Sequence, residues 1–192
     1  KNKIQIQGNN DYEFDKLIAC GGLWSDKLFS KSTYEKSPLK IIPFRGEYLK
    51  FKEEFNDVIN HLVYPVPDSN FPFLGVHFTR MIDGSKEVGP NAVLALKRDG
   101  YYNTSFSFTE ALDSLSYPGL LRFISKNFAF SINEFKSSFF KSSFIAKAQK
   151  MIPDVRSNML VRGPAGIRAQ AVSINGDLLM DFCRTSQCDK HT

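Results

Sequence analysis

Two arginines and one histidine carry the clearest chemical signals in the sequence. Arg45 lies in the segment PFRGEY, and Arg168 follows the glycine-rich segment 163–167. A guanidinium matches a carboxylate in bidentate geometry, so both arginines are candidates for binding an acidic ligand. His77 lies between apolar residues in GVHFTR. Its imidazole could accept a hydroxyl proton, because its pKa lies near neutrality.

Each of these side chains also has a purely structural interpretation. Arg45 could form a surface ion pair with Glu47, two positions along the same predicted strand. The same alternative applies to Arg168. A single histidine in a strand is more often a hydrogen-bonded structural residue than a base. The residue types alone leave both interpretations open.

A glycine turn is the third candidate for a binding site. Cys20, Gly21 and Gly22 follow an apolar run and precede a predicted helix. Glycines there let backbone amides approach an anion or a cofactor closely, although an ordinary tight turn would look the same. The sequence contains no P-loop, HExxH, GxSxG, EF-hand loop or GxGxxG. The three cysteines, at positions 20, 183 and 188, form no CxxC pair, so we expect neither a disulfide framework nor a metal site.

The predicted secondary-structure elements that position these residues are strands, then helices, then strands. Period-two alternation, turn residues and apolar runs predict the strands 3–7, 12–20, 41–51, 61–66, 73–79, 92–96, 166–172 and 177–182. Turns are expected at 8–10 and at 175–176, and a hairpin loop at 81–85 with 92–96 as its return strand. This order predicts an α+β fold with a mostly antiparallel sheet and a helical insertion.

The helical insertion spans residues 107–152 and should contain two or three helices. Ser107 with Glu110, and Ser131 with Glu134, have capping-box spacing. The phenylalanines between 106 and 144 recur at helical spacing, which favours core packing. A predicted core-facing stripe consists of Ile132, Phe135, Phe139, Ile145, Ala148 and Ile152.

Composition narrows the class of protein. Of the 192 residues, 42% are hydrophobic and 23% charged, which is typical of a globular domain. The net charge of +5 comes from scattered basic residues, so it indicates at most attraction to an anion, which could be a small acid, a phosphate or an acidic membrane face, and no nucleic acid is expected. The cysteine usage favours a reducing compartment.

Several segments together resemble one family, the L-2-hydroxyglutarate dehydrogenases/oxidases. They are LIACGGLWSD (17–26), PFRGEY (43–48), LVYPVPD (62–68), the run 70–92 with GVHFTR and GPNA, YPG (117–119) and GIRAQ (166–170). The resemblance implies an FAD-dependent oxidoreductase of the D-amino-acid-oxidase type. In this type a Rossmann-like FAD domain is interleaved with a substrate domain built on an antiparallel sheet. Hydride would pass from C2 of L-2-hydroxyglutarate to the flavin, giving 2-oxoglutarate, and electrons would pass on to oxygen or a membrane electron carrier.

The resemblance also assigns residues and boundaries. It implies that residues 1–40 belong to the FAD-binding domain, 41–172 form the substrate-binding domain, and 173–192 return toward the FAD domain in a divergent tail. The chain resembles the middle and later part of such an enzyme. His77 would be the catalytic base. The substrate-binding residues would be Arg45, Tyr48 and Arg168, and the cofactor-binding residues Cys20, Gly21, Gly22 and Trp24.

Two further expectations complete this reading. The alternative function is a non-catalytic dicarboxylate-binding module that lacks flavin. The expected location is intracellular, cytoplasmic or mitochondrial, with peripheral association with a membrane.

Overall fold

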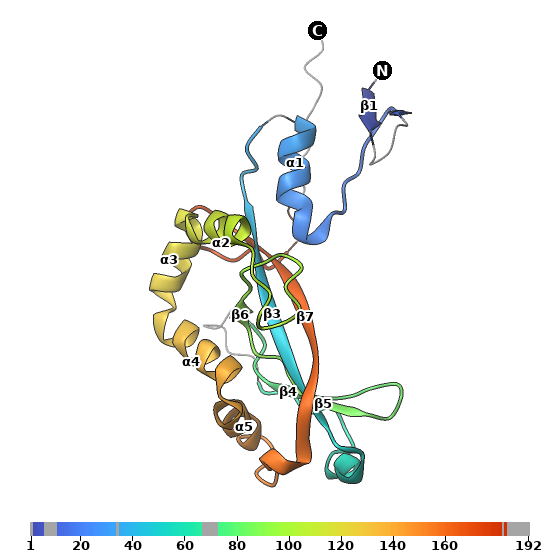
Figure 1. Ribbon diagram of the computed structural model, residues 1–192, viewed down its shortest axis with the longest axis vertical. Coiled ribbons are helices and arrows are strands. Elements are labelled where there is room, and N and C mark those ends of the chain that lie inside the picture. Colours follow the sequence, from blue (N-terminus) through green and yellow to red (C-terminus); the bar gives the residue numbers. More distant parts are fainter. Residues whose placement is uncertain (1, 6–10, 34, 67–72, 182, 184–192) are drawn as a thin grey trace.

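A computed structural model describes residues 2–5, 11–33, 35–66, 73–181 and 183. Two long antiparallel strands form its axis, β3 (Lys40–Phe51) and β7 (Leu160–Val172). They pair from Lys40 opposite Val172 to Phe51 opposite Leu160, with an irregularity between Glu47 and Leu49. The strand β7 therefore begins six residues before the predicted 166, because it follows β3 along its length (Figure 1).

Three short strands complete this sheet. They are β4 (His77–Arg80), β5 (Lys86–Gly89) and β6 (Val93–Leu94), and the order is β4-β5-β3-β6, with β7 also pairing with β3. Every pairing is antiparallel. The predicted α+β fold with a mostly antiparallel sheet is confirmed.

Several strand boundaries differ from prediction. The return strand of the 81–85 hairpin is 86–89 instead of 92–96, because Met81 N–H bonds to the Ser85 carbonyl and the chain reverses at once. The predicted strand 61–66 is reduced to one bridge between Val63 and Phe78. The turn at 175–176 is present with Gly176 at φ +85°, but the arm after it is a single bridge, Val172 to Leu178.

The N-terminal segment forms a hairpin of β1 (Asn2–Gln5) and β2 (Asp11–Phe14). The turn predicted at 8–10 lies outside the described residues. β2 ends at Phe14 instead of Cys20, and residues 15–20 are exposed without a strand partner among the described residues. A 3-10 turn, η1 (Gly22–Trp24), and helix α1 (Ser25–Thr33) follow, which confirms the predicted glycine turn and helix.

The helical insertion contains four helices, more than the two or three predicted. They are α2 (Phe108–Leu115), α3 (Pro118–Lys126), α4 (Phe128–Phe139) and α5 (Lys141–Gln149), and they follow one another along one side of the sheet (Figure 1). Two 3-10 turns flank other elements, η2 (Glu53–Val58) after β3 and η3 (Ser157–Met159) before β7.

The two predicted capping boxes are wrong. Helix α2 does follow Ser107, but that hydroxyl contacts Thr109, while the Glu110 carboxylate accepts the Arg98 backbone N–H at 2.6 Å. Glu134 lies in the middle of α4 and accepts the backbone N–H of Ala92 at 3.0 Å. In both cases a long-range contact takes the carboxylate that a cap would need.

Two apolar clusters hold the helices to the sheet. In one, Phe51, Phe78 and Val88 of the sheet pack with Phe144 and Ile145 of α5. The other contains residues of β3, β7 and α3: Ile42, Phe44, Val172, Leu120 and Phe123.

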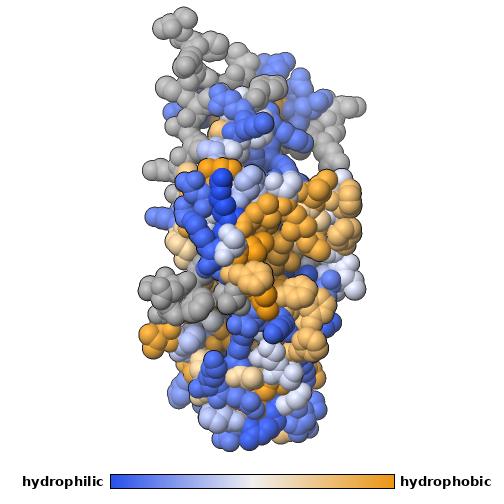
Figure 2. Space-filling view, turned by 90° about the vertical axis from the view of Figure 1, so that its left-hand side faces the viewer, coloured by the Kyte–Doolittle hydropathy of each residue, from blue (hydrophilic) through white to orange (hydrophobic). Residues whose placement is uncertain are grey.

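The apolar side chains that the structure describes in helix α4 belong to neither cluster. Phe128, Ile132, Phe135 and Phe139 are all exposed, and Figure 2 shows apolar side chains gathered on the helical side of the molecule. The predicted core stripe is therefore right in α5 and wrong in α4. Among the described residues, no helix combines the length and the apolar character needed to cross a bilayer.

Candidate functional site

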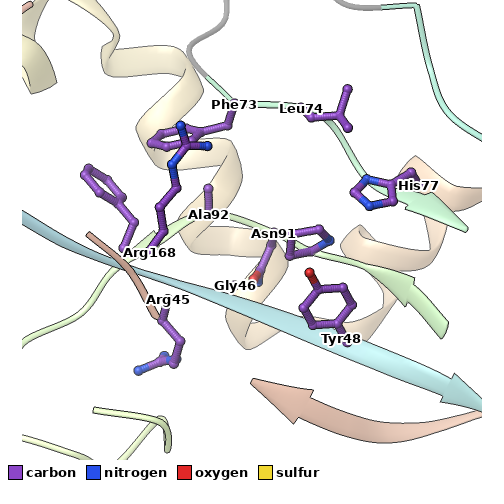
Figure 3. A pocket seen from close by; sticks show the side chains of 11 residues that line it. Arg45, Gly46, Tyr48, Phe73, Leu74, His77, Asn91, Ala92 and Arg168 are labelled. Carbon is purple, nitrogen blue, oxygen red and sulfur yellow. The ribbon is translucent and has the colours of Figure 1, made fainter. Parts of the chain in front are cut away.

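A cavity of about 200 Å³ lies beside β3, near the start of β4 and the end of β5. It brings together three residues predicted from the sequence, Tyr48, His77 and Arg168 (Figure 3). The other lining residues are Phe44, Arg45, Gly46, Phe73, Leu74, Pro90, Asn91 and Ala92. An imidazole, a phenol and a guanidinium thus share one small cavity.

Gly89 links the strands that carry Tyr48 and His77. His77 pairs with Gly89 in the β4–β5 ladder, and Gly89 also lies against Tyr48. A Cβ on Gly89 would lie 2.9 Å from Cδ1 of Tyr48 and 2.8 Å from the Glu47 carbonyl oxygen, and its φ is +152°. Only glycine fits at this position, because a Cβ would collide with the Tyr48 ring and with the backbone of β3.

His77 has a defined orientation. Its Nδ1 lies 3.0 Å from the Gly75 carbonyl oxygen, and its ring stacks on Tyr64 with centroids 4.6 Å apart. A carbonyl can only accept, so Nδ1 carries the proton in the neutral ring. Nε2 then keeps the lone pair, which a general base requires.

Tyr48 is suited to donate a hydrogen bond. Burial raises the pKa of its phenol above the ordinary value, and the charges of Glu87 and Tyr64 raise it further. The hydroxyl is therefore protonated at neutral pH and available to an anionic ligand.

Arg168 is an exposed cation next to this cavity. Its guanidinium carbon lies 5.1 Å from the centre of the Phe73 ring, which it covers. Within the described part of the chain, no carboxylate forms an ion pair with it. The guanidinium fork can therefore receive a carboxylate from a ligand.

Arg45 differs from the other three predicted residues. Its guanidinium points away from the cavity, on the opposite side of β3 from Tyr48 (Figure 3). It pairs with Glu47 at 3.0 Å and donates to the Tyr102 carbonyl at 3.1 Å, and the residue is only 7% exposed. The ion pair considered in the sequence alternative is present, but it is buried. Arg45 lines the cavity while its charged group lies elsewhere.

Sequence reasoning missed the polar group behind the cavity wall. The Glu47 carboxylate accepts hydrogen bonds from Arg45, from Asn91 at 2.9 Å and from the Ser138 hydroxyl at 2.8 Å. Asn91 in turn accepts the Glu47 backbone N–H at 2.8 Å. These contacts join residues far apart in sequence, so no local pattern could reveal them.

A second cavity, of about 450 Å³, adjoins the first. It is lined by the glycine turn and α1, by Arg168–Ala171 of β7, and by the segment after the C-terminal turn. Arg168 lines both cavities, so they meet at its side chain. The volume lies within the roughly 300–1,000 Å³ usual for ligand sites.

Of the four predicted cofactor residues, Gly22 lines this larger cavity, and Cys20, Gly21 and Trp24 do not. Gly22 lines it with φ +50°, and open space surrounds the position where its Cβ would be. A Cβ on Gly21 would collide with Leu28 of α1, so this glycine allows the turn to close onto the helix. Cys20 is exposed before the turn, and Trp24 lies beneath Arg98. An open backbone turn beside a cavity of this size fits part of a large cofactor, whereas the described residues offer no cluster of metal ligands.

Comparisons with known proteins found a matching family model and several relatives. A family model described as "FAD dependent oxidoreductase" matches residues 2–186. L-2-hydroxyglutarate dehydrogenase from Indibacter alkaliphilus is 49% identical over 167 residues, covering 87% of this chain and 42% of that protein. The protein of the same name from Escherichia coli K12 is 45% identical, covering 93% and 42%. The human mitochondrial one is 44% identical, covering 86% and 36%. The chain thus spans about two fifths of the length of these relatives.

Proposed function

We propose, since this chain belongs to the family of FAD-dependent oxidoreductases, that the whole protein oxidises L-2-hydroxyglutarate to 2-oxoglutarate. The observation that carries the proposal is the meeting at one cavity of His77, Tyr48 and Arg168, an arginine that forms no ion pair with any described residue. The names of relatives 43–49% identical to the chain supply the substrate. A cation, a donor and a base are the groups that a hydroxy acid requires.

Each side chain has a distinct role in this proposal. Arg168 binds a substrate carboxylate, and the Tyr48 hydroxyl donates to a carboxylate or to the C2 oxygen. Nε2 of His77 accepts the proton of the C2 hydroxyl as the carbonyl forms. FAD, when bound, supplies the acceptor for the hydride that leaves C2. Arg45 does not contact substrate in this proposal, because its guanidinium lies on the other side of β3. It instead holds the Glu47 carboxylate in place through their ion pair.

The cofactor assignment rests on the larger cavity. We assign Gly21 and Gly22 to the backbone turn facing the cofactor, with Cys20 and Trp24 flanking it. Residues 1–40 then belong to the FAD-binding domain, 41–172 to the substrate-binding domain, and 173–192 to the return toward the first. The position of Arg168 between the cavities is consistent with substrate bound next to the flavin.

Flavin absorption spectroscopy tests this function. The protein is loaded with FAD, and L-2-hydroxyglutarate is added without oxygen. We expect the flavin band to bleach, and His77→Gln to slow the bleaching by about 10²- to 10⁴-fold, the usual worth of a general base. Arg168→Ala should raise the substrate concentration needed for half-maximal rate. Arg162→Ala, at another exposed arginine of β7, is the matched control.

The alternative, a dicarboxylate-binding module without flavin, predicts a different result. Protein that retains no flavin but binds L-2-hydroxyglutarate in calorimetry would favour it. Bleaching at the wild-type rate in His77→Gln would keep the oxidoreductase and remove the base from that residue.

We also propose that the electrons pass to a membrane carrier and that the protein docks peripherally on an anionic membrane. Support comes from the exposed apolar side chains of α4 together with local charge. Residues 118–150 contain one acidic residue, Glu134, against Arg122, Lys126, Lys136, Lys141, Lys147 and Lys150. Apolar side chains flanked by cations suit anionic lipid. Oxygen is the alternative acceptor, and faster flavin reoxidation by oxygen than by a quinone would favour it.

The names of the same relatives also indicate a cellular location. The human and nematode ones are named as mitochondrial, and the bacterial ones are not. We propose an intracellular location, cytoplasmic or mitochondrial according to the host.

A further inference from the structure

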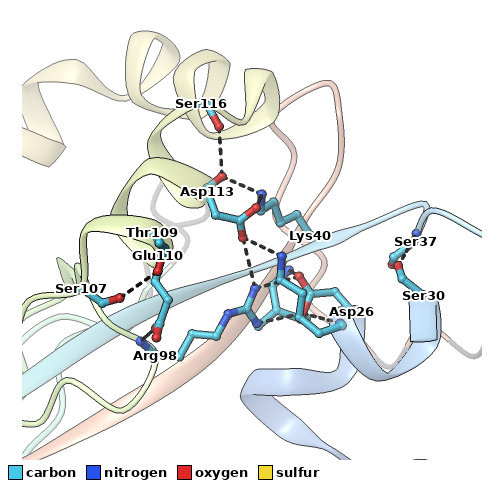
Figure 4. A network of polar contacts seen from close by, with 12 residues as sticks. Asp26, Ser30, Ser37, Lys40, Arg98, Ser107, Thr109, Glu110, Asp113 and Ser116 are labelled. Carbon is cyan, nitrogen blue, oxygen red and sulfur yellow. Dashed lines mark hydrogen bonds and ion pairs between the residues drawn. The ribbon is translucent and has the colours of Figure 1, made fainter. Parts of the chain in front are cut away.

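A buried arginine that the proposed chemistry does not use holds the glycine turn in place. Arg98 is only 2% exposed, and its guanidinium reaches three groups of the turn and α1. Nη1 donates to the Leu23 carbonyl, and Nη1 and Nη2 donate to the two Asp26 carboxylate oxygens at 2.8 and 2.9 Å. The same guanidinium lies 5.3 Å from the centre of the Trp24 ring. Figure 4 shows it entering the polar network from the opposite side to α1.

Asp26 extends this contact to the sheet. It lies in the first turn of α1, and its Oδ2 also accepts the Ile41 backbone N–H at 3.3 Å. The carboxylate therefore joins α1 both to the start of β3 and to Arg98. Because Asp26 itself lines the larger cavity, a shift of this group would change the cavity wall.

A second carboxylate completes the charge balance. Asp113 of α2 accepts from Lys40 at 2.6 Å, pairs with Lys27 at 2.9 Å, and lies 3.8 Å from Nη2 of Arg98. Burial raises the pKa of Asp113, but the hydrogen bonds from Lys40 and Lys27 outweigh it and lower the pKa. The group is therefore ionised at neutral pH, and helix α1 is held against α2 by charged contacts.

Arg98 is itself anchored at some distance from the turn. It follows β6, and its backbone N–H bonds to Glu110 of α2. The side chain then reaches back to Leu23 and Asp26, more than seventy residues earlier in the chain. The conformation of the turn, including Gly22 at φ +50°, is thus fixed from the substrate-binding part of the chain.

We propose that Arg98 is a positioning residue for the cofactor. It fixes the backbone of residues 22–24 at the larger cavity, so that the turn does not have to be ordered when the cofactor binds. This inference rests on the proposed function, because it takes the larger cavity as the place of FAD. The physical basis is preorganisation: a turn that is rigid beforehand loses less conformational entropy on binding.

The test separates cofactor affinity from folding. Arg98→Lys keeps the charge but loses the planar fork that reaches Leu23 and both Asp26 oxygens at once. We expect the dissociation constant for FAD, measured by titrating the apoprotein, to rise about 10- to 100-fold, the range that applies when the hydrogen-bond partner of a metal ligand is removed. The visible circular dichroism of the bound flavin should change as well. The KM for L-2-hydroxyglutarate should stay within about twofold, since the smaller cavity is not touched. Arg162→Lys, the same change at an exposed arginine of β7, should change none of these.

A second variant covers the case in which Arg98→Lys fails to fold. Arg98→Met combined with Asp26→Leu replaces the buried ion pair with apolar groups, which folding commonly tolerates. It should show the same loss of FAD affinity. A folded variant that binds FAD as tightly as wild type, with an unchanged flavin signal, would overturn the inference. If the wild type binds no FAD, the proposed function fails first, and the two failures are thereby distinguished.

Discussion

Helices α4 and α5 follow one another in the chain and use similar residues, yet they bury opposite kinds of side chain. In α5 the apolar residues Phe144, Ile145 and Ala148 lie in the core. In α4 the apolar stripe faces outward, with Phe135 at 59% exposure against 3% for Phe144. The apolar period of a helix therefore locates a stripe, but it does not tell which side of the helix faces the core.

The described side chains on the inward side of α4 are polar, and they have hydrogen-bond partners. Glu134 accepts the Ala92 N–H and pairs with Lys147, and the Ser138 hydroxyl donates to Glu47. A buried polar group is costly only where it lacks a partner. Because α4 contacts the wall of the smaller cavity through these bonds, its polar side supports the site and its apolar side remains for another surface.

We expect the largest loss of stability from a change in α5, whose apolar side chains lie in the core. We expect Phe144→Ala to lower the free energy of unfolding by about 3–5 kcal/mol, because it leaves a cavity in the cluster with Phe51 and Phe78. Phe135→Ala, the same change on α4, should cost about 0.5 kcal/mol or less. Urea denaturation of both variants measures the difference. Equal losses would mean that the stripe on α4 is covered.

We expect an intermediate loss of stability from a change on the polar side of α4. Glu134→Ala leaves the Ala92 N–H and the Lys147 ammonium without their acceptor, so we expect a loss of about 1–3 kcal/mol in the free energy of unfolding. Because Ala92 lines the smaller cavity, substrate binding should weaken as well. Glu54→Ala, at an exposed acid of η2, is the control. A stability equal to wild type would show that these inward bonds contribute nothing.

The same contrast explains what the sequence could predict. Alternation predicts the strand 41–51, and all four predicted catalytic and substrate-binding residues line one cavity, although the Arg45 guanidinium points away from it. Strand alternation also accounts for Arg45, because residues three apart on a strand point to opposite faces, and Tyr48 takes the cavity side.

The missed features all depend on contacts distant in sequence. Arg98 has no motif, and its role becomes visible only when the chain brings it to Leu23 and Asp26. Glu134 has capping-box spacing from Ser131, yet its partners lie in the segment after β5 and in α5. Local patterns cannot rank such long-range partners against local ones.

We expect the smallest change in stability from Phe135→Ser combined with Phe139→Ser. This double variant also tests whether the exposed apolar side chains of α4 bind a membrane. The two rings contact each other, with centroids 4.7 Å apart, and both are exposed. The free energy of unfolding should therefore change by less than about 1 kcal/mol. Sedimentation with vesicles containing anionic lipid should nevertheless fall severalfold relative to wild type, because the apolar groups that would enter the interface are gone. Wild-type binding should weaken with neutral vesicles or added salt, since the cations near α4 contribute through charge. Unchanged sedimentation of the double variant would contradict docking through this stripe, and a concentration-dependent dimer of the wild type that the variant loses would assign the stripe to a second copy of the chain.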